Sequence, residues 1–123
     1  MKIFLIDDNT IDLLISRKLL QKHNSALTII EFDRAQDAVN ALQNVTEVPP
    51  DLVLLDLNMP GMNGWEFLEA VKQQNCQPKR VFILTSSLDE RDKSMASEYP
   101  SVKGYITKPL NTDSITQALD LSV

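Results

Sequence analysis

The stretch LLDLNMPGMNG, residues 54–64, joins an apolar segment directly to a carboxylate, Asp56, and then to a turn rich in Asn, Pro and Gly. Near the N-terminus, FLIDDNT at residues 4–10 repeats this arrangement with Asp7 and Asp8. Ionised carboxylates at the ends of buried segments repel one another and resist desolvation. The two stretches therefore indicate either two ordinary turns or a site that uses their negative charge.

The length and composition are those of one globular domain, which we expect to cover residues 1–123. The chain is 43% hydrophobic and 24% charged, and its formal net charge is -5. Its 12 basic residues are scattered along the sequence, so we expect no direct binding to nucleic acid and no membrane association. Cys76 is the single cysteine. No internal disulfide is then possible, and the sequence favours a reducing compartment such as the cytoplasm.

Short apolar runs alternate five times with segments of helical periodicity. The runs predict strands at 2–6, 27–32, 51–56, 80–85 and 102–107. The helical segments are marked by Ile11, Leu14, Ile15 and Leu19 up to about Lys22, by Ala35, Ala38, Val39, Leu42 and Val45, by Phe67, Leu68 and Val71 between Gly64 and about Gln73, by Leu88, Met95 and Ala96, and by Ile115, Ala118 and Leu119. Pro49 and Pro50 are expected to stop the second helix.

The starts of three helices have recognisable capping residues. Ser87 and Glu90 have the spacing of a capping box, and Asn63 and Asn111 are suitable N-caps for the third and fifth helices. A repeat of apolar strand and helix predicts an α/β fold, a doubly wound (βα)5 flavodoxin-like three-layer sandwich. Its five-stranded parallel sheet should have the order 2-1-3-4-5. Strands 1 and 3 then flank the point where the winding reverses, and ligands bind at the carboxyl ends of the strands there.

Polar side chains gather at these carboxyl ends. Strand 1 ends in Asp7 and Asp8, strand 3 in Asp56, strand 4 in Thr85 and strand 5 runs into Lys108. Clustered carboxylates form an oxygen-only site that suits Mg²⁺ or Mn²⁺. Asp56 is then a candidate nucleophile toward a phosphoryl group, Lys108 a cation for the phosphoryl oxygens, and Thr85 or Ser86 a hydroxyl donor to the same group.

Each of these residues also has an ordinary structural interpretation. Asp7 and Asp8 have the chemistry of helix caps or first-turn acids, and Asp56 that of a turn former. Lys108 alone would be a solvated loop lysine, and Thr85 a β-branched strand residue. These interpretations must hold independently of one another, whereas one metal and phosphoryl site accounts for all of these positions.

The segments IDDN, LLDLNMPGMNG, ILTSS and GYITKPL, in this order and at these separations, resemble the receiver domain of two-component response regulators. The resemblance covers the whole chain. It implies that Asp56 is the phosphoacceptor, and that Asp8, Asp56 and the backbone carbonyl of Asn58 ligate Mg²⁺ while Asp7 acts mainly through water. It also implies that Lys108 contacts the phosphoryl group and precedes a cis bond to Pro109.

The resemblance further implies a conformational switch made of Thr85 and Tyr105, and a dependence of phosphoryl lifetime on the residues at positions 58 and 87. The expected donor is a sensor histidine kinase or a histidine phosphotransfer protein, and the expected target is a downstream effector protein. Because the chain ends at Val123, soon after the last expected helix, we expect no attached output domain. The stretch ASEYPSVKGY, residues 96–105, departs from the family pattern through the bulky Tyr99 and Pro100.

Three functional hypotheses follow from the sequence. The first and favoured one is a stand-alone phosphorylatable switch that is not an enzyme. The second is a degenerate receiver that acts as a phosphorylation-independent interaction module. The third is an aspartate-nucleophile phosphatase like the haloacid dehalogenases, although Asn58 stands where that class usually has a second acid.

Overall fold

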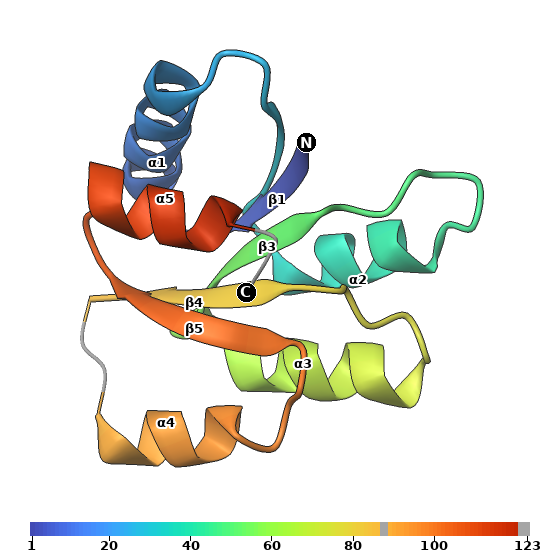
Figure 1. The fold of residues 1–123 in the computed structure, drawn as a ribbon. Coiled ribbons are helices and arrows are strands. Elements are labelled where there is room, and N and C mark those ends of the chain that lie inside the picture. The colour runs from blue at the N-terminus through green and yellow to red at the C-terminus, as the bar shows by residue number, and fades with distance from the viewer. Residues whose placement is uncertain (87–88, 121–123) are drawn as a thin grey trace.

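Five parallel strands form one sheet with the spatial order β2-β1-β3-β4-β5, and helices cover both of its faces (Figure 1). The computed structural model describes residues 1–86 and 89–120. The strands and helices are β1 (Lys2–Ile6), α1 (Thr10–His23), β2 (Thr28–Phe32), α2 (Ala35–Gln43), β3 (Leu52–Asp56), α3 (Gly64–Gln73), β4 (Val81–Thr85), α4 (Glu90–Ala96), β5 (Val102–Thr107) and α5 (Thr112–Leu119). The predicted fold class and strand order are confirmed.

The two faces of the sheet carry separate apolar layers because successive side chains of a strand point to opposite sides. In β3, Leu52 and Leu54 pack with the buried residues of α1 and α5. Val53 and Leu55 pack instead with α2 and α3. All residues of β3 and β4 are buried, as expected of central strands in a sheet that is covered on both faces.

Register brings the ends of the strands to one level. Ile6 pairs with Leu55, and Thr85 pairs with Thr107. Asp7, Asp56 and Lys108 therefore leave the sheet at the same edge, although Lys108 follows Asp7 by 101 positions.

The helix α1 is confirmed, but the side that it buries differs from the expected apolar stripe. Leu13 and Leu20 are buried against the sheet together with Ser16, whereas Ile11, Leu14 and Ile15 are 67%, 40% and 44% exposed. The apolar residues of this helix cover more of its circumference than the sheet and α5 can bury.

Two expected helix boundaries were wrong. The helix α2 ends at Gln43, and Val45 is 96% exposed, because the Asn44 side chain accepts hydrogen bonds from the amide and hydroxyl of Thr46 and turns the chain. The helix α4 begins at Glu90, and its capping box is formed by Asp89 and Asp92. Ser87 and Leu88, which were assigned to this helix, lie outside the described residues. The N-caps Asn63 and Asn111 are confirmed.

The unusual Tyr99 connects the end of α4 to α3. Its ring stacks on Trp65 with 6.3 Å between centroids, and its hydroxyl donates a 2.9 Å hydrogen bond to Glu69. These contacts link the loop after α4 to α3. Within the described ranges, no helix has the length and apolarity needed to cross a bilayer.

Candidate functional site at the carboxyl edge of the sheet

Three carboxylates meet where β1 and β3 end. One oxygen of each of Asp7, Asp8 and Asp56 lies within 4.8 Å of the others. Asp7 and Asp56 are only 1% and 6% exposed, whereas Asp8 is exposed to solvent. Two buried like charges at this separation repel each other with little screening by water.

The turn after β1 holds Asp7 in place. Its backbone amide donates to the carbonyl of Phe32 at 3.0 Å, and its Oδ1 accepts a 3.0 Å hydrogen bond from the amide of Asn9. The N-cap of α1 is Asn9, whose side chain accepts from the amides of Ile11 and Asp12. The alternative in which Asp7 or Asp8 caps this helix is therefore wrong, and both carboxylates point into the site or to solvent.

The turn after β3 depends on Gly64. A Cβ at this position would lie 2.8 Å from the carbonyl oxygen of Asp56 and 2.9 Å from the Cα of Leu57. Gly64 also donates its amide to the carbonyl of Leu57 at 3.0 Å. The start of α3 therefore approaches the backbone of Asp56 so closely that only glycine fits, and this approach fixes the position of Asp56.

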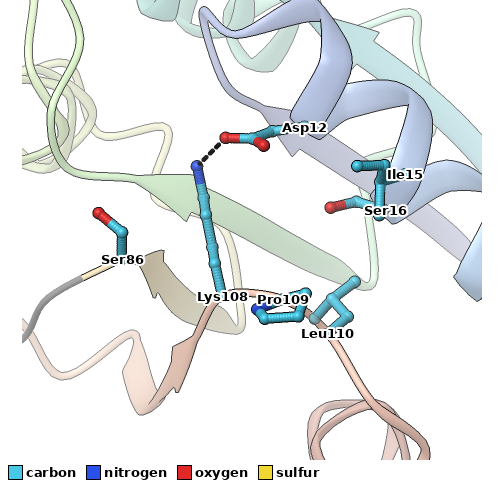
Figure 2. Close-up of a pocket in the computed structure, with 7 residues that line it drawn as sticks. All are labelled: Asp12, Ile15, Ser16, Ser86, Lys108, Pro109 and Leu110. Carbon is cyan, nitrogen blue, oxygen red and sulfur yellow. Dashed lines mark hydrogen bonds and ion pairs between the residues drawn. The ribbon is translucent and has the colours of Figure 1, made fainter.

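Lys108 supplies the positive charge of the site (Figure 2). Its Nζ donates to Asp7 Oδ2 at 2.7 Å and to Asp12 Oδ2 at 2.9 Å, and it lies 3.8 Å from Asp56 Oδ2. The Lys108 side chain is 16% exposed, which excludes the interpretation as a solvated loop lysine. The bond between Lys108 and Pro109 is cis, as the family resemblance implied.

The environment of Asp56 disfavours its ionised form. Burial and the neighbouring charge of Asp7 raise the pKa of Asp56 to about 6, against the opposing effects of Lys108 and the Asn58 amide. Burial alone would lower the pKa of Lys108, but hydrogen bonds to Asp7 and Asp12 outweigh it and raise that pKa. The ammonium thus compensates only part of the negative charge around it.

Thr85 and Tyr105 lie on the α4 side of the site. Thr85 is fully buried at the end of β4, and its carbonyl accepts a 2.8 Å hydrogen bond from the amide of Lys108. Tyr105 packs against Ile83 and Ala96, and its hydroxyl approaches the carbonyl of Lys93 in α4 at 3.5 Å. Thr85 therefore lies beside β5, the strand whose Tyr105 contacts α4.

Asp12 is the member of the site that sequence reasoning missed. It reads as an ordinary acid in the first turn of a helix, which the helix dipole favours. The one feature of the sequence that could have indicated a role for Asp12 is its position one helical turn after Asp8, at the end of α1 that faces the carboxyl edge of the sheet. Asp12 and Lys108 also line a pocket of about 240 Å³ together with Ser86 and Ile15.

The chemistry of this arrangement fits a hard cation. The candidate metal ligands at this edge, Asp7, Asp8 and Asp56, all offer carboxylate oxygens. Together they carry more negative charge than the single ammonium of Lys108 neutralises. A divalent ion such as Mg²⁺ prefers carboxylate oxygens and keeps several of its waters, which the exposed side at Asp8 permits. A bound cation would also screen the repulsion between these carboxylates and an incoming anionic group such as a phosphoryl group.

Removing the charge of Asp56 is expected to stabilise the metal-free protein. A pKa of about 6 in the folded state, against 3.8 in the unfolded state, means that ionisation of Asp56 costs stability above pH 6 and that this cost vanishes as the pH falls below 4. We expect Asp56→Asn to raise the free energy of unfolding by about 3 kcal/mol at pH 7.5 and to lose this advantage by pH 4. Urea denaturation in EDTA measures both values.

The matched control is Asp33→Asn, which removes an exposed acid at the end of β2 and should keep the pH dependence of the wild type. An Asp56→Asn protein that gains no stability at pH 7.5, or whose gain persists unchanged at pH 4, would contradict the assignment of the electrostatic cost to Asp56.

Comparison with known proteins agrees with this geometry. The family described as response regulator receiver domain matches residues 3–120. A crystal structure of a two-component response regulator from Cytophaga hutchinsonii is 30% identical, with a TM-score of 0.85, and the match covers 95% of this chain and 92% of that chain. The nitrate/nitrite response regulator protein NarL of Escherichia coli is 30% identical over 117 residues, 95% of this chain and 52% of NarL.

A further relative is a protein-glutamate methylesterase/protein-glutamine glutaminase from Treponema denticola, which is 31% identical over 92% of this chain and 30% of its own length. The chain thus spans about half or less of these two curated relatives, and what it shares with them is one domain. The chain belongs to the family of response regulator receiver domains, the signalling domains of two-component systems.

Proposed function

We propose that residues 1–123 form a single receiver domain in which Asp56 accepts a phosphoryl group and the resulting conformational change controls a partner protein. The observation that carries this proposal is the position of Lys108. Its ammonium lies 3.8 Å from the buried Asp56 carboxylate at an edge where Asp7 and Asp8 add two further carboxylates. A degenerate receiver gains nothing from keeping these repelling charges together.

The transfer is a displacement at phosphorus. A carboxylate oxygen of Asp56 forms the new bond to phosphorus while the bond between phosphorus and the donor nitrogen breaks, and the donor histidine recovers a proton from solvent. Lys108 stabilises the negative charge on the phosphoryl oxygens. Attack of water on the phosphorus of the acyl phosphate breaks its bond to Asp56, releases inorganic phosphate and restores the Asp56 carboxylate.

The residues that would hold Mg²⁺ are Asp8, Asp56 and the backbone carbonyl of Asn58, with Asp7 acting through water. When bound, Mg²⁺ would screen the repulsion between the carboxylates and the incoming phosphoryl oxygens. The chain itself keeps Asp56 oriented through the Asn58 amide, which approaches Asp56 Oδ1 at 3.4 Å. Asp7 keeps Lys108 beside the acceptor through their 2.7 Å ion pair.

The switch in this proposal consists of Thr85 and Tyr105. The Thr85 hydroxyl donates to the phosphoryl group and leaves space beside β5, and Tyr105 turns inward to fill that space. The Tyr105 hydroxyl makes only a weak 3.5 Å contact with the carbonyl of Lys93 in α4. Breaking this contact adds little to the barrier for rotation of the Tyr105 side chain. The phosphoryl group thus favours one of two conformations and shifts their populations.

The donor in this proposal is a sensor histidine kinase or histidine phosphotransfer protein, and the target is an effector protein, with the domain acting in the cytoplasm. The chain is not an enzyme toward another substrate in this account, although it assists its own phosphorylation and dephosphorylation. Receiver domains interact with kinases and effectors in general, and this supports both partner classes.

The acceptor is tested by intact-mass spectrometry after incubation with phosphoramidate, which mimics a phosphohistidine donor. We expect one phosphoryl adduct on the wild type with Mg²⁺, none in EDTA, and none on Asp56→Asn, because the asparagine amide is a poor nucleophile. Asp51→Asn is the matched control, since Asp51 binds the backbone of Lys2 far from the site. Equal modification of Asp56→Asn, or an unmodified wild type, would refute the acceptor assignment.

The switch is tested with Thr85→Val, which keeps the shape of a buried side chain and removes its hydroxyl. We expect this variant to accept the phosphoryl group while the Tyr105 ring resonances in an NMR spectrum stay at their unphosphorylated positions. The wild type should show shifted Tyr105 resonances under the same conditions. Identical shifts in both proteins would contradict a role for the Thr85 hydroxyl in the switch.

A further inference from the structure

We infer that Asp12 is a positioning residue that holds the Lys108 ammonium in the resting state and competes with the phosphoryl group for it. This inference rests on the proposed function. It assigns a role to a carboxylate from α1 that lies outside the acidic cluster of Asp7, Asp8 and Asp56. Asp12 thereby sets how readily the site accepts a phosphoryl group.

The hydrogen bonds of Lys108 show this competition. An ammonium has three N–H donors, and Lys108 directs two of them to Asp7 at 2.7 Å and Asp12 at 2.9 Å, while Asp56 Oδ2 lies at 3.8 Å from the Nζ. Figure 2 shows the Lys108 side chain reaching up to Asp12 from the opposite side of the pocket. In the resting state the ammonium is therefore held by Asp7 and Asp12 more closely than by the acceptor.

The two partners of Lys108 differ in how easily they release it. Asp7 is 1% exposed, so the loss of its ion pair would leave an uncompensated buried charge. The Asp12 side chain is 35% exposed, and water can solvate its carboxylate once the ammonium leaves. Asp12 is therefore the partner that gives up Lys108 when the phosphoryl oxygens arrive.

The position of Asp12 is fixed by the backbone of α1. Its amide donates a 3.1 Å hydrogen bond to the Asn9 side chain that caps the helix, so the carboxylate starts from a rigid first turn. A negative charge held there also opposes the negative phosphoryl group directly. Both effects have the same sign, since each makes phosphoryl binding less favourable while Asp12 is ionised.

The experiment measures binding of beryllofluoride, a stable mimic of the phosphoryl group, with saturating Mg²⁺. Trp65 is the single tryptophan of the sequence and packs against the cluster of Leu57, Ile83 and Ala96, as Tyr105 does, so we use its fluorescence to follow occupation of the site. We expect Asp12→Asn to bind beryllofluoride about threefold to fivefold more tightly than the wild type, the effect of losing one partly exposed ion pair. Asp12→Glu, which keeps the charge, should return the affinity toward that of the wild type.

Two controls separate this role from a general change of charge or structure. Asp33→Asn removes the same charge from the same edge without contacting Lys108 and should leave the affinity unchanged. In a Lys108→Ala background no ammonium is left to compete for and only the direct, solvent-screened repulsion by Asp12 remains, so Asp12→Asn should raise the affinity by less than about twofold. An equal gain in that background, an equal gain from Asp33→Asn, or no gain from Asp12→Asn in the wild type overturns the inference.

Failure of the proposed function would look different. A wild-type protein that binds no beryllofluoride with Mg²⁺ refutes the phosphoryl site and the role of Asp12 together. A wild-type protein that binds it as tightly as Asp12→Asn refutes only the role of Asp12. Loss of affinity in Asp12→Asn would show that Asp12 supports phosphoryl binding by Lys108 and does not compete with it.

Discussion

The repulsion between Asp7 and Asp56 is the interaction on which the rest of the site depends. Both carboxylates are buried, and together with Asp8 they bring an oxygen each to within 4.8 Å of the others. The fold tolerates this because Lys108 lies between them, with its Nζ at 2.7 Å from Asp7 and 3.8 Å from Asp56. The remaining negative charge makes the site favourable for a cation, and together with burial it makes the ionised form of Asp56 less favourable than that of a solvated aspartate.

The sheet makes this arrangement possible by collecting residues that are distant in sequence. Parallel strands end at one edge, and the register between β1, β3, β4 and β5 sets which side chains meet there. Gly64 and the loop before it then press the start of α3 against the backbone of Asp56. Burial of apolar side chains fixes the positions of the strands, and the turns fix the positions of the carboxylates. The free-energy cost of the repulsion between the carboxylates is therefore offset by packing elsewhere in the domain.

The sequence predicted the features that depend on periodicity and on strand ends. The alternation of apolar runs and helices implied the 2-1-3-4-5 sheet, and that order alone placed Asp7, Asp8, Asp56, Thr85 and Lys108 at one edge. Features that depend on competition between a side-chain hydrogen bond and the continuation of a helix, or between alternative faces of a helix, were less predictable. Val45 continues the helical pattern of α2, yet the Asn44 side chain ends that helix, and the apolar pattern of α1 did not show which side faces the sheet.

Asp12 shows a second limit of sequence reasoning. Its pairing with Lys108 depends on the rotation of α1 about its axis and on the path of the loop after β5, which the spacing of residues does not determine. The contact of Tyr99 with Trp65 and Glu69 has the same origin. In both cases the residue type was visible in the sequence, but its partner follows from how a helix is placed on the sheet.

The most direct test of this account is the effect of Mg²⁺ on the free energy of unfolding, measured by urea denaturation at pH 7.5 and constant ionic strength. If the carboxylates are held together as a cation site, Mg²⁺ will stabilise the wild type in a concentration-dependent manner. Asp8→Asn removes the exposed carboxylate of the cluster and should abolish most of that gain. A wild-type stability that does not respond to Mg²⁺, or an undiminished response in Asp8→Asn, would contradict the account.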